Sequence, residues 1–191
     1  MLIKDALELF LIDRELKGNS DKTIKNYKQQ INYYIEYVGN IDVIEITLKS
    51  LQNYQLYLSN KDRYENHPFK INETGIVKKI TVQSYLRQLR VFIRYLFTEG
   101  YIVEDLCIKF KLPKAPKTVI DILNDDEKEK ILNHYDEKSE LKLRNKCIIA
   151  LMLDCGLRRS EVITLEYPNI NYTNNYIKVY GKGNKERLVP M

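Results

Sequence analysis

The sequence predicts a mainly α-helical protein with a small antiparallel β-sheet in its last part, divided into two domains. The first part of the chain repeats apolar residues at the three- and four-residue spacing of amphipathic helices. The segment 109–120 then combines prolines with lysines, a composition typical of an extended linker. Beyond residue 170, short runs of tyrosine, isoleucine and valine are separated by turn residues, as in strands. We therefore expect a helical domain over 1–108 and a smaller α+β domain over 121–191.

Three helices are expected in the first 60 residues. Apolar side chains recur at helical spacing over residues 2–16, and Gly18 ends this pattern. Ser20 is a suitable N-cap for a second helix, which should end at Gly39, and Thr47 is suited to cap a third. Each helix has one apolar face, so the three should pack around a common core.

A long loop and a fourth helix follow. Residues 60–78 show no sustained period and contain a proline and a glycine, which predicts a loop of a length that is usually functional or mobile. The fourth helix is expected from Thr81 to the residue before Gly100. Its polar side carries three arginines spaced by three and four, namely Arg87, Arg90 and Arg94.

The fourth helix can be interpreted in two ways. A stripe of three arginines is usually a solvated face, but no acidic residue lies between Lys78 and Arg94. Unbalanced positive charge of this kind favours contact with phosphate groups. We therefore predict that a DNA-binding set comprises these arginines and nearby lysines of the helix start and the linker: Lys78, Lys79, Arg87, Arg90, Arg94, Lys114 and Lys117.

The distribution of charge agrees with this prediction. Residues 1–120 contain 19 Lys and Arg against 14 Asp and Glu, a net charge of +5, whereas residues 121–191 contain 12 of each kind. A basic part beside a neutral part is one expected footprint of nucleic-acid binding. An excess of this size is also common on ordinary soluble proteins.

The second domain should begin with two helices. Asn124 is a suitable cap for a helix over 125–135, whose first turn is acidic as the helix dipole favours. A helix over 141–154 is apolar on nearly all sides, which predicts that it is the buried central helix of this domain. A short helix should then begin at Arg158, and strands are expected over 170–172, 176–180 and 187–191.

Charged residues in the second domain form a set suited to a phosphate. Arg158 and Glu161 are three positions apart at a helix start and share a face, while Lys182 lies in a turn between Gly181 and Gly183. Taken singly, the first two could form a surface ion pair and the turn could be an ordinary hairpin loop. Together they offer a planar guanidinium that can bind two phosphate oxygens and an ammonium group on a flexible turn.

The order of these residues carries a family resemblance. Cys-Gly-Leu-Arg-Arg-Ser-Glu at 155–161, Gly-Lys-Gly-Asn-Lys-Glu-Arg at 181–187 and the closing Val189-Pro190 resemble the first part of the catalytic domain of tyrosine recombinases, the phage-integrase family. The earlier helices resemble the helical SAM-like core-binding domain of the same family. That second likeness rests on Ser20, Thr23 and Tyr27 in an early helix and on Leu89, Arg90, Phe92, Tyr95 and Leu96 in a late one.

The resemblance implies a chemistry and roles for individual residues. Arg158 would be the first of two catalytic arginines, Glu161 the acid that orients the site, and Lys182 the proton donor on the β-hairpin. Lys185 and Arg187 would contact the DNA backbone. The complete enzyme breaks and rejoins double-stranded DNA through a 3′-phosphotyrosine link as a homo-oligomer on DNA, without a metal or other cofactor, in integration and recombination of mobile elements.

The sequence also departs from the family pattern. The His-x-x-Arg motif and the tyrosine nucleophile that follow in the family do not occur in the matching positions of these 191 residues. Asp105-Leu106 replaces a common Asn-Pro, and Cys155 replaces a common threonine. The resemblance therefore implies a truncated catalytic domain, and we expect the chain to bind DNA without cutting it. Three functions stay open: the DNA-binding portion of a site-specific recombinase, a truncated non-catalytic regulator of recombination, or a helical interaction protein without a DNA role.

Other classes of protein are disfavoured. No apolar run approaches the roughly 20 residues of a membrane helix, and the acidic, amphipathic start is unlike a signal peptide, so a cytoplasmic protein without a membrane partner is expected. Cys107, Cys147 and Cys155 are odd in number, widely spaced and set among apolar residues. They suit buried thiols better than disulfides or a zinc site, and no metal is predicted.

Overall fold

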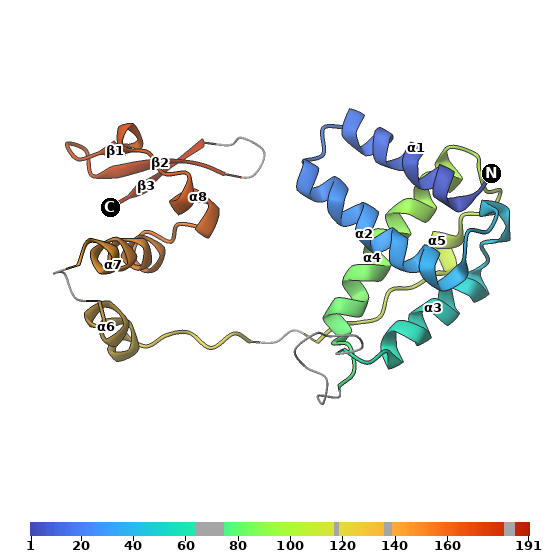
Figure 1. Cartoon of the computed structure of the whole chain (residues 1–191), viewed down its shortest axis with the longest axis horizontal. Coiled ribbons are helices and arrows are strands. Elements are labelled where there is room, and N and C mark those ends of the chain that lie inside the picture. The colour runs from blue at the N-terminus through green and yellow to red at the C-terminus, as the bar shows by residue number, and fades with distance from the viewer. Residues whose placement is uncertain (64–74, 117–118, 136–138, 182–185) are drawn as a thin grey trace. The chain divides into compact units, whose positions relative to one another are not determined.

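The computed structural model describes residues 1–63, 75–116, 119–135, 139–181 and 186–191. The chain divides into two compact units, Met1–Thr118 and Val119–Met191 (Figure 1). The first unit is helical, and the second combines helices with one sheet. The predicted fold class, mainly α with a small antiparallel sheet, is confirmed.

The first unit consists of four longer helices and one short helix. Their bounds are α1 Ile3–Leu16, α2 Asp21–Val38, α3 Leu48–Asn60, α4 Lys79–Thr98 and α5 Leu106–Lys109. The predicted caps are confirmed, because Ser20 Oγ accepts the N–H of Thr23 and Thr47 Oγ1 accepts the N–H of Ser50. Helix α4 begins two residues before the predicted Thr81, since the carbonyl of Lys78 already accepts the N–H groups of Thr81 and Val82.

Helix α4 is the central element of the first unit. It packs against α1, α2, α3 and α5, as Figure 1 shows. In the core, the Phe10 ring of α1 meets Phe92 and Tyr95 of α4 edge to face, with centroids 5.4 and 5.3 Å apart. Fully burying a side chain of this size contributes roughly 1.5–3 kcal/mol, so these contacts fix α4 on its neighbours.

The first unit continues into the segment expected to be a linker. Lys109 ends α5, and Phe110 is only 1% exposed within the core of this unit. Leu112 packs partly against the same core, and the side-chain amide of Gln83 donates to the carbonyl of Pro113 at 2.9 Å. The first residues of the expected linker 109–120 are therefore part of the first unit. The proline and lysine content of the segment hid the two apolar residues that pack there, Phe110 and Leu112.

The second unit contains α6 Asp125–Asn133, α7 Glu140–Leu153, α8 Arg159–Ile163 and a three-stranded antiparallel sheet. The strands are β1 Ile170–Asn171, β2 Tyr176–Tyr180 and β3 Glu186–Pro190, and β2 lies between the other two. The register places Ile177 opposite Val189. The buried apolar residues of this unit are Leu157, Ile177, Val179 and Val189.

The prediction that the helix over 141–154 is a buried central helix is wrong for the described unit. None of the described residues of α7 is buried, and Ile148 and Met152 are 36% and 41% exposed. Cys147 on the same helix is exposed, whereas Cys107 in the first unit is buried as expected. Apolar composition predicted the burial, but α7 packs mainly against α6 and α8, and its Leu151 is only partly buried against the small core of this unit.

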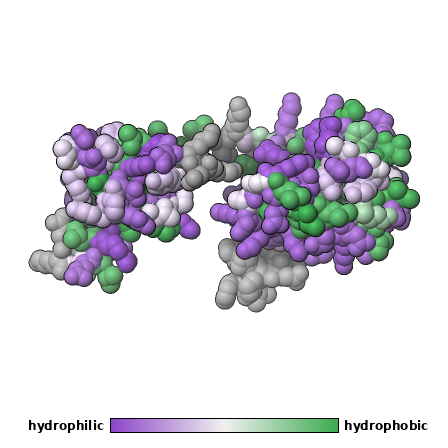
Figure 2. Space-filling model, turned by 90° about the horizontal axis from the view of Figure 1, so that it is seen from above, coloured by the Kyte–Doolittle hydropathy of each residue, from purple (hydrophilic) through white to green (hydrophobic). Residues whose placement is uncertain are grey.

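The hydropathy of the surface and the length of the helices are relevant to whether the chain could span a membrane. Hydrophilic residues predominate on the face shown in Figure 2, with apolar groups in patches between them. Among the described residues, no helix combines the length and apolar character that crossing a bilayer requires.

Candidate nucleic-acid interface

Arg158 is placed by the turn that joins α7 to α8. Gly156 has a φ of 62°, a left-handed conformation that glycine adopts at little cost, and Leu157 is buried directly after it. Arg158 then precedes α8, and its backbone N–H donates to Glu161 Oε2 at 2.8 Å. The anchored turn and this hydrogen bond together fix where the arginine side chain leaves the backbone.

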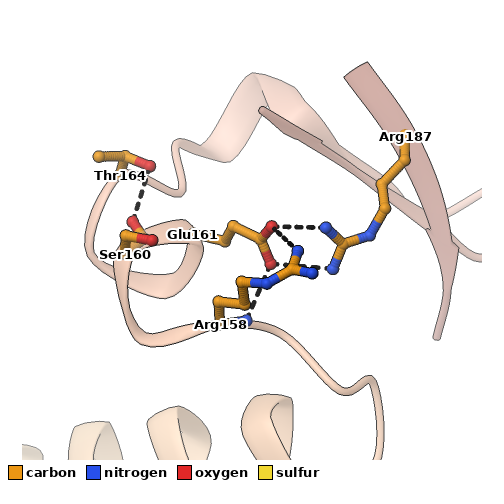
Figure 3. A network of polar contacts seen from close by, with 5 residues as sticks. All are labelled: Arg158, Ser160, Glu161, Thr164 and Arg187. Atoms are coloured by element: carbon orange, nitrogen blue, oxygen red, sulfur yellow. Dashed lines mark hydrogen bonds and ion pairs between the residues drawn. The ribbon is translucent and has the colours of Figure 1, made fainter. Parts of the chain in front are cut away.

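Glu161 is shared by two arginines (Figure 3). Arg187 Nη1 donates to Oε1 at 2.5 Å and Arg187 Nη2 to Oε2 at 2.9 Å, while Arg158 Nη1 donates to Oε1 at 3.0 Å. The Glu161 side chain is 1% exposed. The hydrogen bonds from Arg187, followed by that from the Arg158 backbone, hold the pKa of Glu161 at about 2, against an ordinary 4.5. The carboxylate is therefore ionised at neutral pH.

The Arg158 guanidinium remains open to a ligand. Its side chain is 70% exposed, and Nη1 is the only one of its nitrogens that donates to a described residue. It lines a cavity of about 530 Å³ together with Ser160, Thr164, Tyr180 and Gly181. A guanidinium held at one nitrogen and exposed at the others can bind a phosphate oxygen pair.

The structure brings three of the sequence-predicted residues together and leaves others undetermined. Arg158, Glu161 and Arg187 meet, whereas Lys182 and Lys185 lie outside the described residues. Gly181, directly before Lys182, lines the same cavity as Arg158. The link between Arg187 and Glu161 was missed from the sequence because the two lie 26 positions apart. A DNA contact through the remaining donors of Arg187 stays a prediction.

The low pKa of Glu161 predicts how the stability of the second unit depends on pH. The carboxylate binds a proton less readily in the folded chain, with a pKa of about 2, than at the ordinary value of 4.5. Its contribution is therefore complete above about pH 4.5 and is lost as the pH falls toward 2. We expect the free energy of unfolding of this unit to decrease over that window, by at most about 1.4 kcal/mol per pH unit from this one group.

Denaturant titrations at successive pH values, followed through the amide signals of β2 and β3, measure this dependence. A free energy of unfolding that stays constant between pH 5 and pH 3, to within about 0.3 kcal/mol, would contradict the assignment of the low pKa to the folded second unit.

The arginine stripe of the first unit is less uniform than its sequence suggests. Arg94 pairs with the buried Asp105 at 2.7 Å, and Arg90 Nη2 donates to the carbonyl of Cys107 at 3.0 Å. Arg87 is exposed, and its one hydrogen bond to a described residue goes to the amide oxygen of Gln83, at 3.3 Å. The expectation of unbalanced charge is therefore wrong at Arg94, because its partner Asp105 follows the acid-free segment 78–94 in the chain.

A groove nonetheless gathers positive side chains on the first unit. It measures about 440 Å³, and its charged lining consists of one acid, Glu99, and five cations, Arg14, Lys17, Arg87, Arg90 and Arg94. Arg14 of α1 and Lys17, directly after α1, also contact Asp13. The groove adds these two residues to the predicted set, and they could not be predicted because they lie far in the sequence from the arginines of α4.

The remaining predicted lysines are on the surface. Lys78, Lys79 and Lys114 are exposed and have no ion-pair partner among the described residues, while Lys117 lies outside them. Within the part of the chain that the structure describes, no cluster of three or more His, Cys, Asp or Glu side chains could hold a metal ion.

Comparisons with known families cover nearly the whole chain. Residues 6–112 match the family profile described as the phage integrase SAM-like domain, and residues 121–191 match the profile described as the phage integrase family. Among curated proteins, the tyrosine recombinase XerD of Listeria monocytogenes is 29% identical over 190 residues, covering 100% of this chain and 60% of that protein. XerD of Pasteurella multocida is 30% identical over 198 residues, covering 99% of this chain and 61% of that protein.

Solved structures agree on the fold. A lambda integrase dimer bound to a COC′ core site superposes with a TM-score of 0.74 at 18% identity, over 100% of this chain and 62% of that chain. The integrase of the transposon Tn1549, in complex with circular intermediate DNA, gives a TM-score of 0.66 at 16% identity, over 97% of this chain and 60% of that chain. The present chain thus spans about 60% of the length of the curated relatives it matches.

Proposed function

The chain belongs to the phage integrase family, and from this premise we propose that it supplies the DNA-binding unit and part of the catalytic site of a site-specific tyrosine recombinase. The observation that carries the proposal is the exposed Arg158 guanidinium, held at one nitrogen by the buried and ionised Glu161. Arg158 thereby adds fixed positive charge to the lining of a cavity, as binding of a phosphodiester requires.

The proposed role of Arg158 is to neutralise charge on the phosphate during strand cleavage. Negative charge develops on the phosphate oxygens while the nucleophile attacks, and preorganised donors stabilise it without reorganising at that moment. Glu161 acts as a positioning residue that orients Arg158, and Arg187 holds Glu161 from β3. Lys182 is proposed as the proton donor to the leaving 5′ oxygen, on the strength of its place in the hairpin motif.

The first unit is proposed to hold double-stranded DNA through its groove and exposed lysines. Arg87 is the most available of the three stripe arginines, and Lys78, Lys79 and Lys114 add unpaired charge on the same unit. Contacts of this kind position a protein on the sugar-phosphate backbone irrespective of base sequence. We further propose that several copies assemble on DNA and that the protein works in the bacterial cytoplasm, where the genome of such relatives is located.

A salt titration tests the DNA-binding proposal directly. Neutralising phosphates releases condensed counterions, so log K should fall linearly with log salt concentration. If about five phosphates are contacted, a fourfold increase in salt should weaken binding of a mixed-sequence duplex by a few hundredfold. Fluorescence anisotropy of a labelled duplex with the whole chain measures this slope. Absence of duplex affinity even at low ionic strength would overturn the proposal and favour a helical interaction protein.

A further inference from the structure

One segment of the first unit runs along the arginine side of α4. This segment, residues 105–113, includes α5 and the start of the expected linker, and it forms a strap on α4. Phe110 of the strap is buried in the core of the unit, and Leu112 lines the groove that the three arginines of α4 also line. The strap is therefore packed beside the surface that is proposed to bind DNA.

Two arginines of α4 contact the strap directly. Arg94 Nη1 lies 2.7 Å from Oδ2 of Asp105, and Arg90 Nη2 donates to the carbonyl of Cys107 at 3.0 Å. In return, the Sγ of Cys107 donates to the carbonyl of Arg90 at 3.4 Å. These contacts fix both guanidinium groups relative to the backbone of the strap.

The third arginine, Arg87, is connected to the strap through the side-chain amide of Gln83. Nε2 of Gln83 donates to the carbonyl of Pro113 at 2.9 Å, and Oε1 accepts Nη2 of Arg87 at 3.3 Å. A carbonyl only accepts and a guanidinium only donates, so the two bonds together determine which end of the amide faces Arg87. The strap thus holds all three arginines, in the reverse of their order along α4.

These contacts orient the arginines without neutralising most of their charge. Arg87 and Arg90 are held by neutral acceptors, an amide oxygen and a carbonyl. Arg94 faces a carboxylate, but its side chain is still 52% exposed. A guanidinium has five N–H donors and each contact occupies one nitrogen, so the remaining donors can bind phosphate oxygens.

The orientation of an arginine affects how tightly it binds phosphate. A free arginine side chain has many rotamers, and ordering it on binding costs conformational entropy. A side chain that is already ordered in the free protein avoids most of that loss. We propose that Gln83 is a positioning residue, which together with the strap holds the arginines of α4 in the orientation that binds phosphate. The inference rests on the DNA binding proposed for the first unit.

Gln83→Ala tests the proposal because it removes both amide hydrogen bonds and leaves the charge of the chain unchanged. The affinity of the whole chain for a mixed-sequence duplex at low salt should fall about threefold. The slope of log K against log salt concentration should stay the same, since no cation is lost. Fluorescence anisotropy of a labelled duplex measures both quantities. Gln52→Ala, which removes an exposed amide of α3, is the matched control and should leave the affinity unchanged.

A double-mutant cycle distinguishes positioning from direct contact with DNA. If Gln83 acts through Arg87, adding Gln83→Ala to Arg87→Gln should change the affinity by less than about 1.5-fold. An amide that contacts DNA itself would cause the same loss with or without Arg87. Gln83→Met keeps the stem of the side chain and gives the same comparison if Gln83→Ala lowers the melting temperature.

The outcomes separate this inference from the proposed function. A loss of affinity in Gln83→Ala that disappears in the Arg87→Gln background supports the positioning role. Unchanged affinity in Gln83→Ala, or a loss that persists without Arg87, would overturn that role and leave the proposed DNA binding intact. Absence of duplex affinity in the unaltered chain would overturn both.

Discussion

Glu161→Gln is expected to unfold the second unit while the first unit stays folded. The substitution removes the charge that two guanidinium groups share, although both arginines can still reach solvent. Breaking a buried ion pair from one side costs roughly 3–5 kcal/mol, and solvent access places this case near the lower end. The buried apolar core of the described second unit consists of four residues, so a loss of this size is comparable with its whole stability.

Amide hydrogen exchange measures this outcome for each unit separately. Protection of β2 and β3 should collapse in the variant, whereas protection of α1, α2 and α4 should match that of the unaltered chain. Glu129→Gln is the matched control, because Glu129 is exposed on α6 and has no ion pair among the described residues. Strands that keep their full protection in Glu161→Gln would show that the shared carboxylate contributes little to folding.

Arg94→Gln should destabilise the first unit and Arg87→Gln should not, although both arginines belong to one stripe. Arg94→Gln leaves the carboxylate of Asp105, whose side chain is 7% exposed, without its ion-pair partner. Among the described residues Asp105 then retains the N–H of Cys107, at 3.0 Å, so the first unit should lose roughly 2 kcal/mol of stability. Arg87 donates to no described residue other than Gln83, so Arg87→Gln should leave stability unchanged.

Duplex affinity, unlike stability, should respond to Arg87→Gln. Removing one exposed phosphate contact is expected to lower the affinity of Arg87→Gln about tenfold at low salt and to reduce the salt slope by about 1. Lys49→Gln, which removes one exposed charge from α3 outside the groove, is the control and should change neither quantity. Equal melting temperatures for Arg94→Gln and the unaltered chain would show that the ion pair with Asp105 does not support the fold.

Elements with local signals were predictable from the sequence. Ser20, Thr47 and Asn124 each cap a helix as expected, because a capping side chain and its N–H target lie within three residues. The three strands follow the predicted order, and their bounds match at three ends and differ by one residue at the other three. The contact between Arg158 and Glu161 could also be predicted from the sequence, since residues three apart at a helix start lie on one face.

Features that depend on distant partners were not predictable. Asp105 forms an ion pair with Arg94 from outside the acid-free segment 78–94, and Arg187 bonds to Glu161 across 26 positions. Apolar composition alone could not show that none of the described residues of α7 is buried. Phe110 was assigned to a linker because prolines and lysines around it dominate the local pattern, whereas it is buried in the hydrophobic core of the first unit.

The two hydrogen bonds from Arg187 to Glu161 have a consequence for the proposed binding and release of a DNA strand. When a phosphodiester draws the Arg158 side chain outward, both carboxylate oxygens keep a guanidinium donor from Arg187, and Oε2 also keeps the backbone N–H. On the proposed role of Arg158, the buried carboxylate of Glu161 therefore keeps hydrogen-bond donors while DNA binds and dissociates. The Arg158 side chain can then move with the bound phosphate while the Glu161–Arg187 ion pair stays in place.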